Sequence, residues 1–209
     1  MADLTSGKYP GQYEPFLLNG KAILRENFDR RYPLASAGVA MTSGTGFVVP
    51  VAFQQGDLIQ KVTIGVKTAS ATPAHGWAAL YTGLVTGSTL IASSQSADDT
   101  SGFHGSGAAQ TFTFSTPYQV GVNPGSTGTD GPVVLGVMLY NEATTGGVLD
   151  GVLSSQAVAG SVFVTGQVPL VFTRSGQSYG ASAPANLGSY AAAAAGAGIP
   201  YVCVTVAAS

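Results

Sequence analysis

The stretch Ala74–Ser96, AHGWAALYTGLVTGSTLIASSQS, contains the only tryptophan of the chain and no Asp, Glu, Lys or Arg. Two short apolar runs flank a segment rich in glycine and threonine, which predicts two strands joined by a turn. The hairpin is built mainly from Ala, Ser, Thr and Gly, and His75 is its only ionisable side chain apart from tyrosine. This pattern indicates a structural role and offers little for catalysis.

Comparable short runs recur from Gly46 to the end of the chain. Apolar and polar residues alternate in some of them, and 132–141 is apolar on both faces, as in the centre of a sandwich. About eight such strands, with turn signals roughly every ten residues, predict an all-β fold, an antiparallel β-sandwich or jelly-roll-like domain over residues 46–209. Besides the two strands of the hairpin, the expected strands are 46–53, 58–67, 109–122 (bent or split at Pro117), 132–141, 161–164 and 199–207.

Residues 1–45 differ from the rest, because they carry half of the charged residues and five aromatic side chains. Segment 19–31, NGKAILRENFDRR, predicts a short helix, since Arg25–Asp29 and Glu26–Arg30 have the spacing of ion pairs on a helix face. The aromatic content argues against disorder and predicts an arm that docks onto its own domain or a neighbour. The residues expected to make this docking contact are Tyr9, Tyr13, Phe16, Arg25, Phe28, Arg30, Arg31 and Tyr32.

Charge and hydropathy exclude several classes of function. Only 9% of the residues are charged, and Arg174 is the single basic residue after Lys67, so a nucleic-acid partner is not expected. The apolar runs are too short for a membrane span, which needs about 20 apolar residues. The lone Cys203 reads as a small buried side chain, and the N-terminus lacks a signal-peptide pattern. Together these features predict assembly in a reducing cytoplasm.

No set of residues has the pattern of an active site. The chain contains no nucleophile elbow, zinc-protease motif, phosphate-binding loop or dinucleotide fingerprint. Asp98, Asp99 and His104 share one loop, but they lack the spacing of a calcium loop and are read as solvated. We therefore expect a protein that is not an enzyme, with no catalytic residue, metal or cofactor.

Trp77 and Tyr81 lie on the same face of their predicted strand, because both are odd-numbered. Buried, they would fill the sandwich core, which is the favoured interpretation because large aromatic side chains dominate cores. Exposed, they would form a surface on which sugar rings stack. The second interpretation defines an alternative function, a carbohydrate- or receptor-binding β-sandwich module.

Three segments carry a resemblance to a known family: HGWAALYTG at 75–83, LIASSQSAD at 90–98 and FTFSTPYQV at 112–120. They resemble the β-sandwich virion structural proteins, of the minor tail or capsid accessory type, of tailed actinobacterial phages. The C-terminal segments VVLGVMLYN and PYVCVTV are similar to the later strands of that family. The resemblance covers about residues 61–209 and implies a non-enzymatic protein that coats or decorates a particle.

The expected protein is therefore a virion surface accessory, either a capsid decoration protein or a minor tail protein, assembled in the host bacterial cytoplasm. Its expected partner is the major capsid or tail protein of the same virion, reached through the arm. A surface this poor in charge also predicts a homo-oligomer, trimeric or higher. Location on the head or the tail, and binding of a glycan, are left open.

Overall fold

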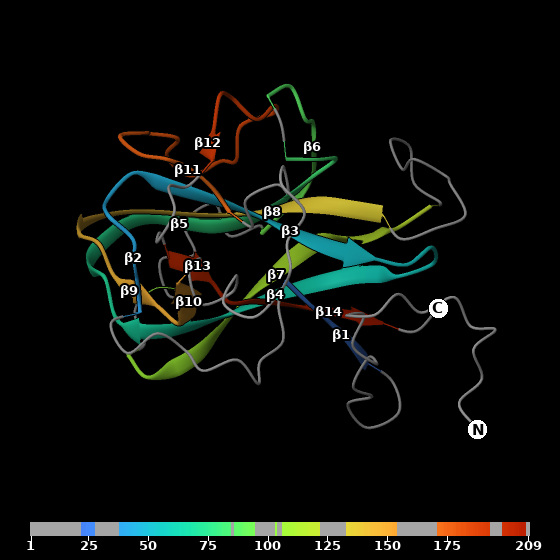
Figure 1. Cartoon of the computed structure of the whole chain (residues 1–209), viewed down its shortest axis with the longest axis horizontal. Coiled ribbons are helices and arrows are strands. Elements are labelled where there is room, and N and C mark those ends of the chain that lie inside the picture. Colours follow the sequence, from blue (N-terminus) through green and yellow to red (C-terminus); the bar gives the residue numbers. More distant parts are fainter. Residues whose placement is uncertain are drawn as a thin grey trace.

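The computed structural model describes residues 22–27, 38–84, 86–94, 103, 106–121, 133–153, 171–192 and 198–207. Within these residues the secondary structure is nearly all β-strand, and the strand pairings are antiparallel. Two sheets face each other with a hydrophobic layer between them (Figure 1). The predicted all-β, antiparallel sandwich is confirmed. The described part of the chain contains no helix long and apolar enough to cross a membrane.

Each of the two large sheets has six strands. Sheet A contains β1 (Ala22–Glu26), β2 (Val39–Ala40), β4 (Leu58–Thr68), β7 (Ala108–Gln119), β9 (Val148–Leu149) and β14 (Val202–Ala207). Its order is β1-β14-β4-β9-β2, and β7 also pairs with β4. Sheet B, in the order β12-β11-β3-β8-β5-β6, contains β3 (Thr45–Phe53), β5 (Ala71–Tyr81), β6 (Leu90–Ser93), β8 (Val133–Thr145), β11 (Phe172–Arg174) and β12 (Ala191–Ala192). A small sheet pairs β10 (Gly151–Leu153) with β13 (Gly198–Pro200).

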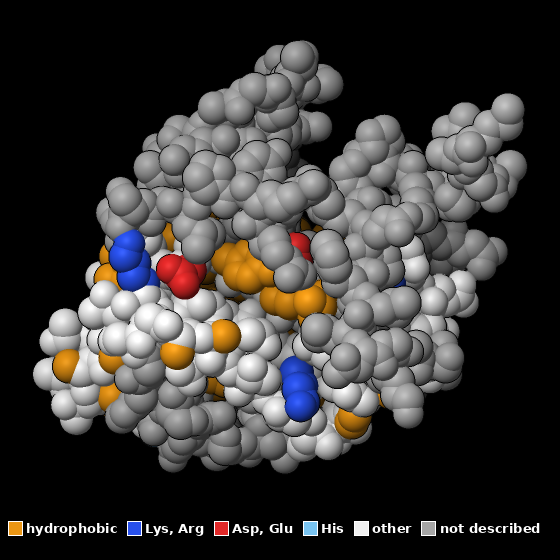
Figure 2. Space-filling view, turned by 90° about the horizontal axis from the view of Figure 1, so that it is seen from below, with side chains coloured by type: hydrophobic (Ala, Val, Ile, Leu, Met, Phe, Trp, Pro, Cys, Tyr) orange, Lys and Arg blue, Asp and Glu red, His pale blue; other side chains and the backbone are white. Residues whose placement is uncertain are grey.

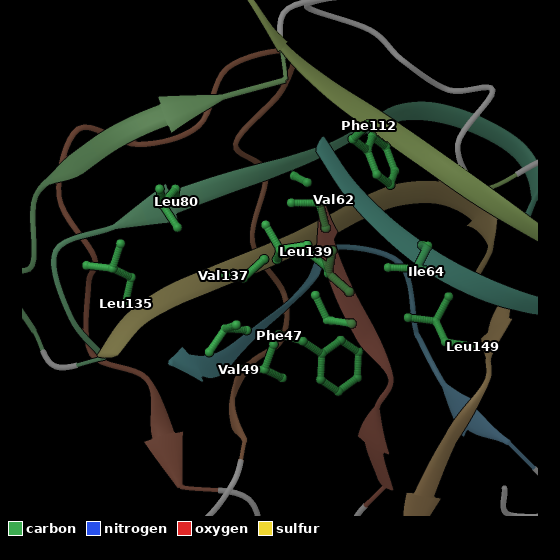
Figure 3. Close-up of a cluster of buried hydrophobic side chains, with 14 of the residues drawn as sticks. Phe47, Val49, Val62, Ile64, Leu80, Phe112, Leu135, Val137, Leu139 and Leu149 are labelled. Carbon is green, nitrogen blue, oxygen red and sulfur yellow. The ribbon is translucent and has the colours of Figure 1, made fainter. Parts of the chain in front are cut away.

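The main hydrophobic core fills the space between sheets A and B. Val62 and Ile64 of β4 and Phe112 of β7 point toward Val137 and Leu139 of β8 (Figure 3). All five side chains are at most 1% exposed. Each buried side chain of this kind contributes about 1.5–3 kcal/mol relative to an exposed one, so this layer is the main source of stability.

One lateral contact connects the two sheets. Ser94, directly after β6, forms an isolated antiparallel bridge with Phe114 of β7. The contact joins the end of sheet B to the outer edge of β7, so that the two sheets curl into half of a barrel. Seen from the sheet A side, the surface shows scattered charged side chains around a group of hydrophobic ones (Figure 2).

Alternation in 58–67 predicts that Leu58, Val62, Ile64 and Val66 share one face, and this prediction needs one correction. Val62, Ile64 and Val66 face the core as expected, but Leu58 is only partly buried and its neighbour Ile59 is fully buried. The pairing register shifts between Ile59 and Lys61 on both neighbouring strands. A β-bulge at this point inserts one residue and reverses the faces of the residues before it. Strict alternation could not anticipate that reversal.

The helix predicted within residues 19–31 is wrong, because residues 22–26 form strand β1. All five residues pair with β14, from Ala22 with Ala207 to Glu26 with Cys203. Ion pairs spaced four apart are worth only about 0.2–0.5 kcal/mol each. Pairing with β14 bonds the backbone groups on one side of the segment, and the Arg25–Asp57 pair adds a buried contact, so tertiary contacts outweigh the local helix signal.

Two further expectations concern short segments. Outside the arm, 189–197, SYAAAAAGA, is the one stretch whose sequence leaves a helical interpretation open, but Ala191–Ala192 form strand β12 against β11. The strand expected at 161–164 lies outside the described residues. Pro117, expected to bend or split its strand, is exposed within β7, and the pairing of β7 with β4 is interrupted between Thr113 and Tyr118.

Thr72 is the only described non-glycine residue with a positive φ, at 46°. This left-handed conformation costs a β-branched residue about 1–2 kcal/mol, and asparagine tolerates it better. We expect Thr72→Asn to raise the free energy of unfolding by about 0.5–1 kcal/mol, measured by urea denaturation. The matched control is Thr113→Asn in β7, an exposed strand position with ordinary φ, where the same change should be neutral or destabilising. Equal effects at both positions would contradict strain at Thr72.

Candidate functional site

The N-terminal strand β1 is fixed to the domain by a buried ion pair. Arg25 Nε lies 2.7 Å from Asp57 Oδ2, and Arg25 Nη2 lies 2.8 Å from Asp57 Oδ1, so the contact is bidentate. The side chains are 9% and 7% exposed. Asp57 Oδ2 also accepts a hydrogen bond from the backbone N–H of Gln54 at 2.9 Å. One carboxylate therefore holds β1 and the β3–β4 turn together.

Two further side chains secure the same strand. The Asn27 amide donates to the Pro200 carbonyl at 2.8 Å, and its oxygen accepts from the Val202 N–H at 2.9 Å. The Tyr201 hydroxyl donates to Glu26 Oε1 at 2.7 Å. Asn27 thus continues the β1–β14 pairing with its side chain. Strand β1, the first element of the described chain, is thereby attached to the C-terminal strand β14.

Of the eight residues expected to dock onto a partner, only Arg25 is described. Its guanidinium is held by Asp57 inside the fold and is not presented to a neighbour. Residues 22–27 and 38–45, although within the predicted arm, contribute strands β1 and β2 and the start of β3. The other docking residues lie outside the described residues: Tyr9, Tyr13, Phe16, Phe28, Arg30, Arg31 and Tyr32.

A second group of aromatic side chains covers the face of sheet B that points away from sheet A. We call residues 175–190, which lie over this face, the strap. Backbone hydrogen bonds from Gln177 to Gly44, from Leu90 to Ala185 and from Leu187 to Ser88 attach it to the sheet. The side chains between strap and sheet are Val48, Trp77, Ala79, Tyr81, Met138, Tyr140 and Leu187, with Leu84, Leu90, Phe172, Tyr179, Ala183 and Tyr190 around them.

Trp77 and Tyr81 lie at the centre of this second cluster, 1% and 0% exposed. The indole N–H of Trp77 donates to the Gly180 carbonyl at 3.1 Å, and the Tyr81 hydroxyl donates to the Pro184 carbonyl at 2.7 Å. The two residues are buried, as favoured from the sequence, but beneath the strap and outside the core between the sheets. No sugar ring can stack on either ring in this structure.

Burial also sets the ionisation of the tyrosines in the cluster. It is the largest cause that raises the pKa of Tyr81, Tyr140 and Tyr190 well above the ordinary value of tyrosine. For Tyr140, the hydrogen bond to Glu142 Oε2 at 2.8 Å adds to the rise. The phenols therefore stay protonated at neutral pH and act as hydrogen-bond donors.

Sequence patterns gave little sign of the strap. Trp77 and Tyr81 alternate with Ala78 and Leu80, which face the main core, so β5 is apolar on both sides. That two-sided pattern was a signal that the outer face also needs a cover. The cover comes about 100 residues later, from a stretch rich in Ser, Gly, Ala and Pro that reads as a loop.

We expect loss of either partner of the Arg25–Asp57 pair to destabilise the fold by about 3–5 kcal/mol, because the remaining charge stays buried and unpaired. Arg25→Met and Asp57→Asn should each lower the free energy of unfolding, and the double variant should lose clearly less than the sum. Urea denaturation measures all three. The control Lys61→Met, at an exposed position of β4, should change stability by less than about 0.5 kcal/mol. Additive losses would show that the pair is not coupled.

The single tryptophan reports directly on the strap. Because Trp77 is 1% exposed, we expect its fluorescence emission to be blue-shifted from that of free tryptophan and weakly quenched by acrylamide. Neutral sugars should leave it unchanged, and unfolding in urea should shift it to longer wavelength. A red-shifted, readily quenched emission from the folded protein would contradict the closed strap.

In sequence comparisons, the chain matched no protein family and no curated protein. Within the described residues, no three His, Cys, Asp or Glu side chains gather in a way that could hold a metal ion. A function therefore has to be inferred from the residues and geometry of the chain itself.

Proposed function

We propose that the protein is a non-enzymatic structural protein of a phage virion, a surface accessory such as a capsid decoration protein or minor tail protein. Its N-terminal arm docks onto the major capsid or tail protein of the same particle. The resemblance of segments 75–83, 90–98 and 112–120 to β-sandwich virion proteins supports this proposal. The low content of charged residues, 9%, agrees with a surface that other subunits cover.

The observation that carries the proposal is the anchoring of β1. Residues 1–21, which contain Tyr9, Tyr13 and Phe16, lead directly into a strand held by five residue pairs and a bidentate ion pair. An arm that attaches a domain to a particle must begin at a firmly held strand. Force on the arm would otherwise separate that strand from its sheet. Here residues 1–21 join the domain at the edge of sheet A, where β1 pairs with β14.

Hydroxyl and other small polar side chains on the outer face of sheet A agree with assembly among copies. Thr63 and Thr111 lie on neighbouring strands with their hydroxyl oxygens 3.0 Å apart, and Thr113 and Ser115 continue the exposed face of β7. These uncharged side chains can be covered by another subunit without the high cost of burying a charge, although Lys61 and Lys67 of β4 lie on the same face and are exposed. We therefore propose a homo-oligomer, trimeric or higher, arranged by the symmetry of the particle.

A truncation that ends before β1 tests docking without removing the strand that is held to the domain. Deletion of residues 2–20 keeps β1, Arg25 and Asn27, so we expect the protein to remain folded, with unchanged blue-shifted Trp77 emission. The same deletion should abolish incorporation into particles, measured as the amount of protein in purified virions. Deletion of residues 2–27 should in addition lower the melting temperature, because Asp57 loses its partner.

Two results would contradict the proposal. Normal loading of the 2–20 deletion would show that residues 2–20, with Tyr9, Tyr13 and Phe16, are not the docking element. Absence of the full-length protein from purified particles would contradict the proposed virion function itself. For particles that contain the protein, immunogold labelling with an antibody against residues 46–209 distinguishes a decorated head from a tail component.

A further inference from the structure

Trp77 begins a series of aromatic rings that leads from beneath the strap toward the surface. Its ring stacks on that of Tyr140, with the centroids 4.8 Å apart and an angle of 29° between the planes. The Tyr179 ring lies 5.2 Å from Tyr140 and 6.2 Å from Trp77. Trp77 and Tyr140 are 1% and 0% exposed, whereas Tyr179 is partly exposed. The three rings therefore connect a buried indole with the surface.

The polar hydrogens of Trp77 and Tyr140 have different acceptors. The Trp77 indole N–H donates to the Gly180 backbone carbonyl at 3.1 Å, and a backbone carbonyl does not take up a proton. The Tyr140 hydroxyl donates to Glu142 Oε2 at 2.8 Å, and a carboxylate is a base. This distance lies within the range over which a proton passes directly to a positioned base. Tyr140 is thus a phenol that can lose an electron and its proton together.

We propose that Trp77, Tyr140 and Tyr179 form an electron-transfer path that removes oxidising equivalents from the buried indole, with Glu142 as the proton acceptor. Under ultraviolet light, Trp77 loses one electron to dissolved oxygen, which becomes superoxide. The indole radical cation keeps its N–H, because Gly180 offers no base, and takes one electron from Tyr140. The Tyr140 O–H bond breaks and its proton moves to Glu142 Oε2. The products of this step are neutral Trp77, a neutral tyrosyl radical and a protonated Glu142.

Tyr179 carries the radical to the surface. Its backbone N–H donates to the Tyr140 hydroxyl oxygen at 3.1 Å, which holds the two residues in contact. Tyr179 gives an electron to the Tyr140 radical, Glu142 returns the proton to Tyr140, and the Tyr179 phenol releases its own proton to water. A dissolved thiol then restores Tyr179 by giving it a hydrogen atom. The path protects the only tryptophan of the chain and does not depend on the virion function.

Tyr81 provides a comparison within the same cluster. It is as deeply buried as Tyr140 and lies on the same strand as Trp77. Its hydroxyl donates to the Pro184 carbonyl at 2.7 Å, which does not take up a proton. Loss of an electron from Tyr81 would therefore leave a positive charge in the interior, and an unpaired buried charge is costly. Tyr140, beside its carboxylate, is the favoured electron donor.

The test is laser flash photolysis of the full-length protein in air-saturated buffer, with ultraviolet light that excites tryptophan and not tyrosine. Transient absorption distinguishes the indole radical cation from the tyrosyl radical. We expect the indole signal to decay as the tyrosyl signal rises, more slowly in deuterium oxide because a proton moves with the electron. Tyr140→Phe and Glu142→Gln should each slow this step by about tenfold or more. Glutamine keeps a hydrogen-bond acceptor but is not a base, so Glu142→Gln should also remove the deuterium effect.

Tyr81→Phe is the matched control, because it removes an equally buried phenol and should leave the rate unchanged. Tyr179→Phe should prolong the tyrosyl signal without slowing its rise. Trp77 emission and melting temperature establish that each variant is folded, and Glu142→Gln provides the second test if Tyr140→Phe is unstable.

Three results would overturn the path. The first is an indole signal that decays equally fast in the unmodified protein, Tyr140→Phe and Glu142→Gln. The second is equal slowing by Tyr81→Phe, which would show that any nearby phenol donates the electron. The third is an unchanged tyrosyl lifetime in Tyr179→Phe, which would exclude Tyr179 as the exit.

Discussion

Strand β8 is apolar on both faces, and the rest of the structure follows from the need to cover both. Val137 and Leu139 face sheet A, while Met138 and Tyr140 face the strap. One extra sheet is insufficient for such a strand, because the second face would expose a large apolar patch to water. The chain meets this requirement with a regular β-layer on one side and an irregular segment on the other. The fold is thus a sandwich with a third, thinner layer.

The two covers are held in different ways. Sheet A packs mainly through aliphatic and phenylalanine side chains, whereas the strap combines aromatic packing with hydrogen bonds from Trp77 and Tyr81 to its carbonyl groups. Trp77 and Tyr140 stack with their ring centroids 4.8 Å apart. An irregular segment cannot pair its backbone as a strand does, so polar ends of buried aromatic side chains take over that task. This difference explains why Trp77, Tyr81 and Tyr140 gather on the outer face, whereas Tyr118 is the single tyrosine of the described core between the sheets.

The positions of the strands could be predicted from the sequence more fully than the contacts between them. Alternation in 58–67 and 109–122 and the two-sided β8 are local patterns, so they could be read without knowledge of the partners. The bulge before Lys61, the strand nature of residues 22–26 and the approach of Arg25 to Asp57 each depend on segments far away in the chain.

The two ends of the described chain impose the last constraint. Because Ala22 pairs with Ala207, residues 1–21 join the domain where the C-terminal strand leaves it. The Arg25–Asp57 pair adds to the backbone pairing and the Asn27 contacts that hold β1 at this sheet edge, and a buried carboxylate without its partner would be strongly destabilising. Stability of the sandwich and the position of β1 therefore depend on the same ion pair. Because backbone pairs and a buried charge pair both tie β1 to its sheet, the strand belongs to the domain and is not a detachable end of it.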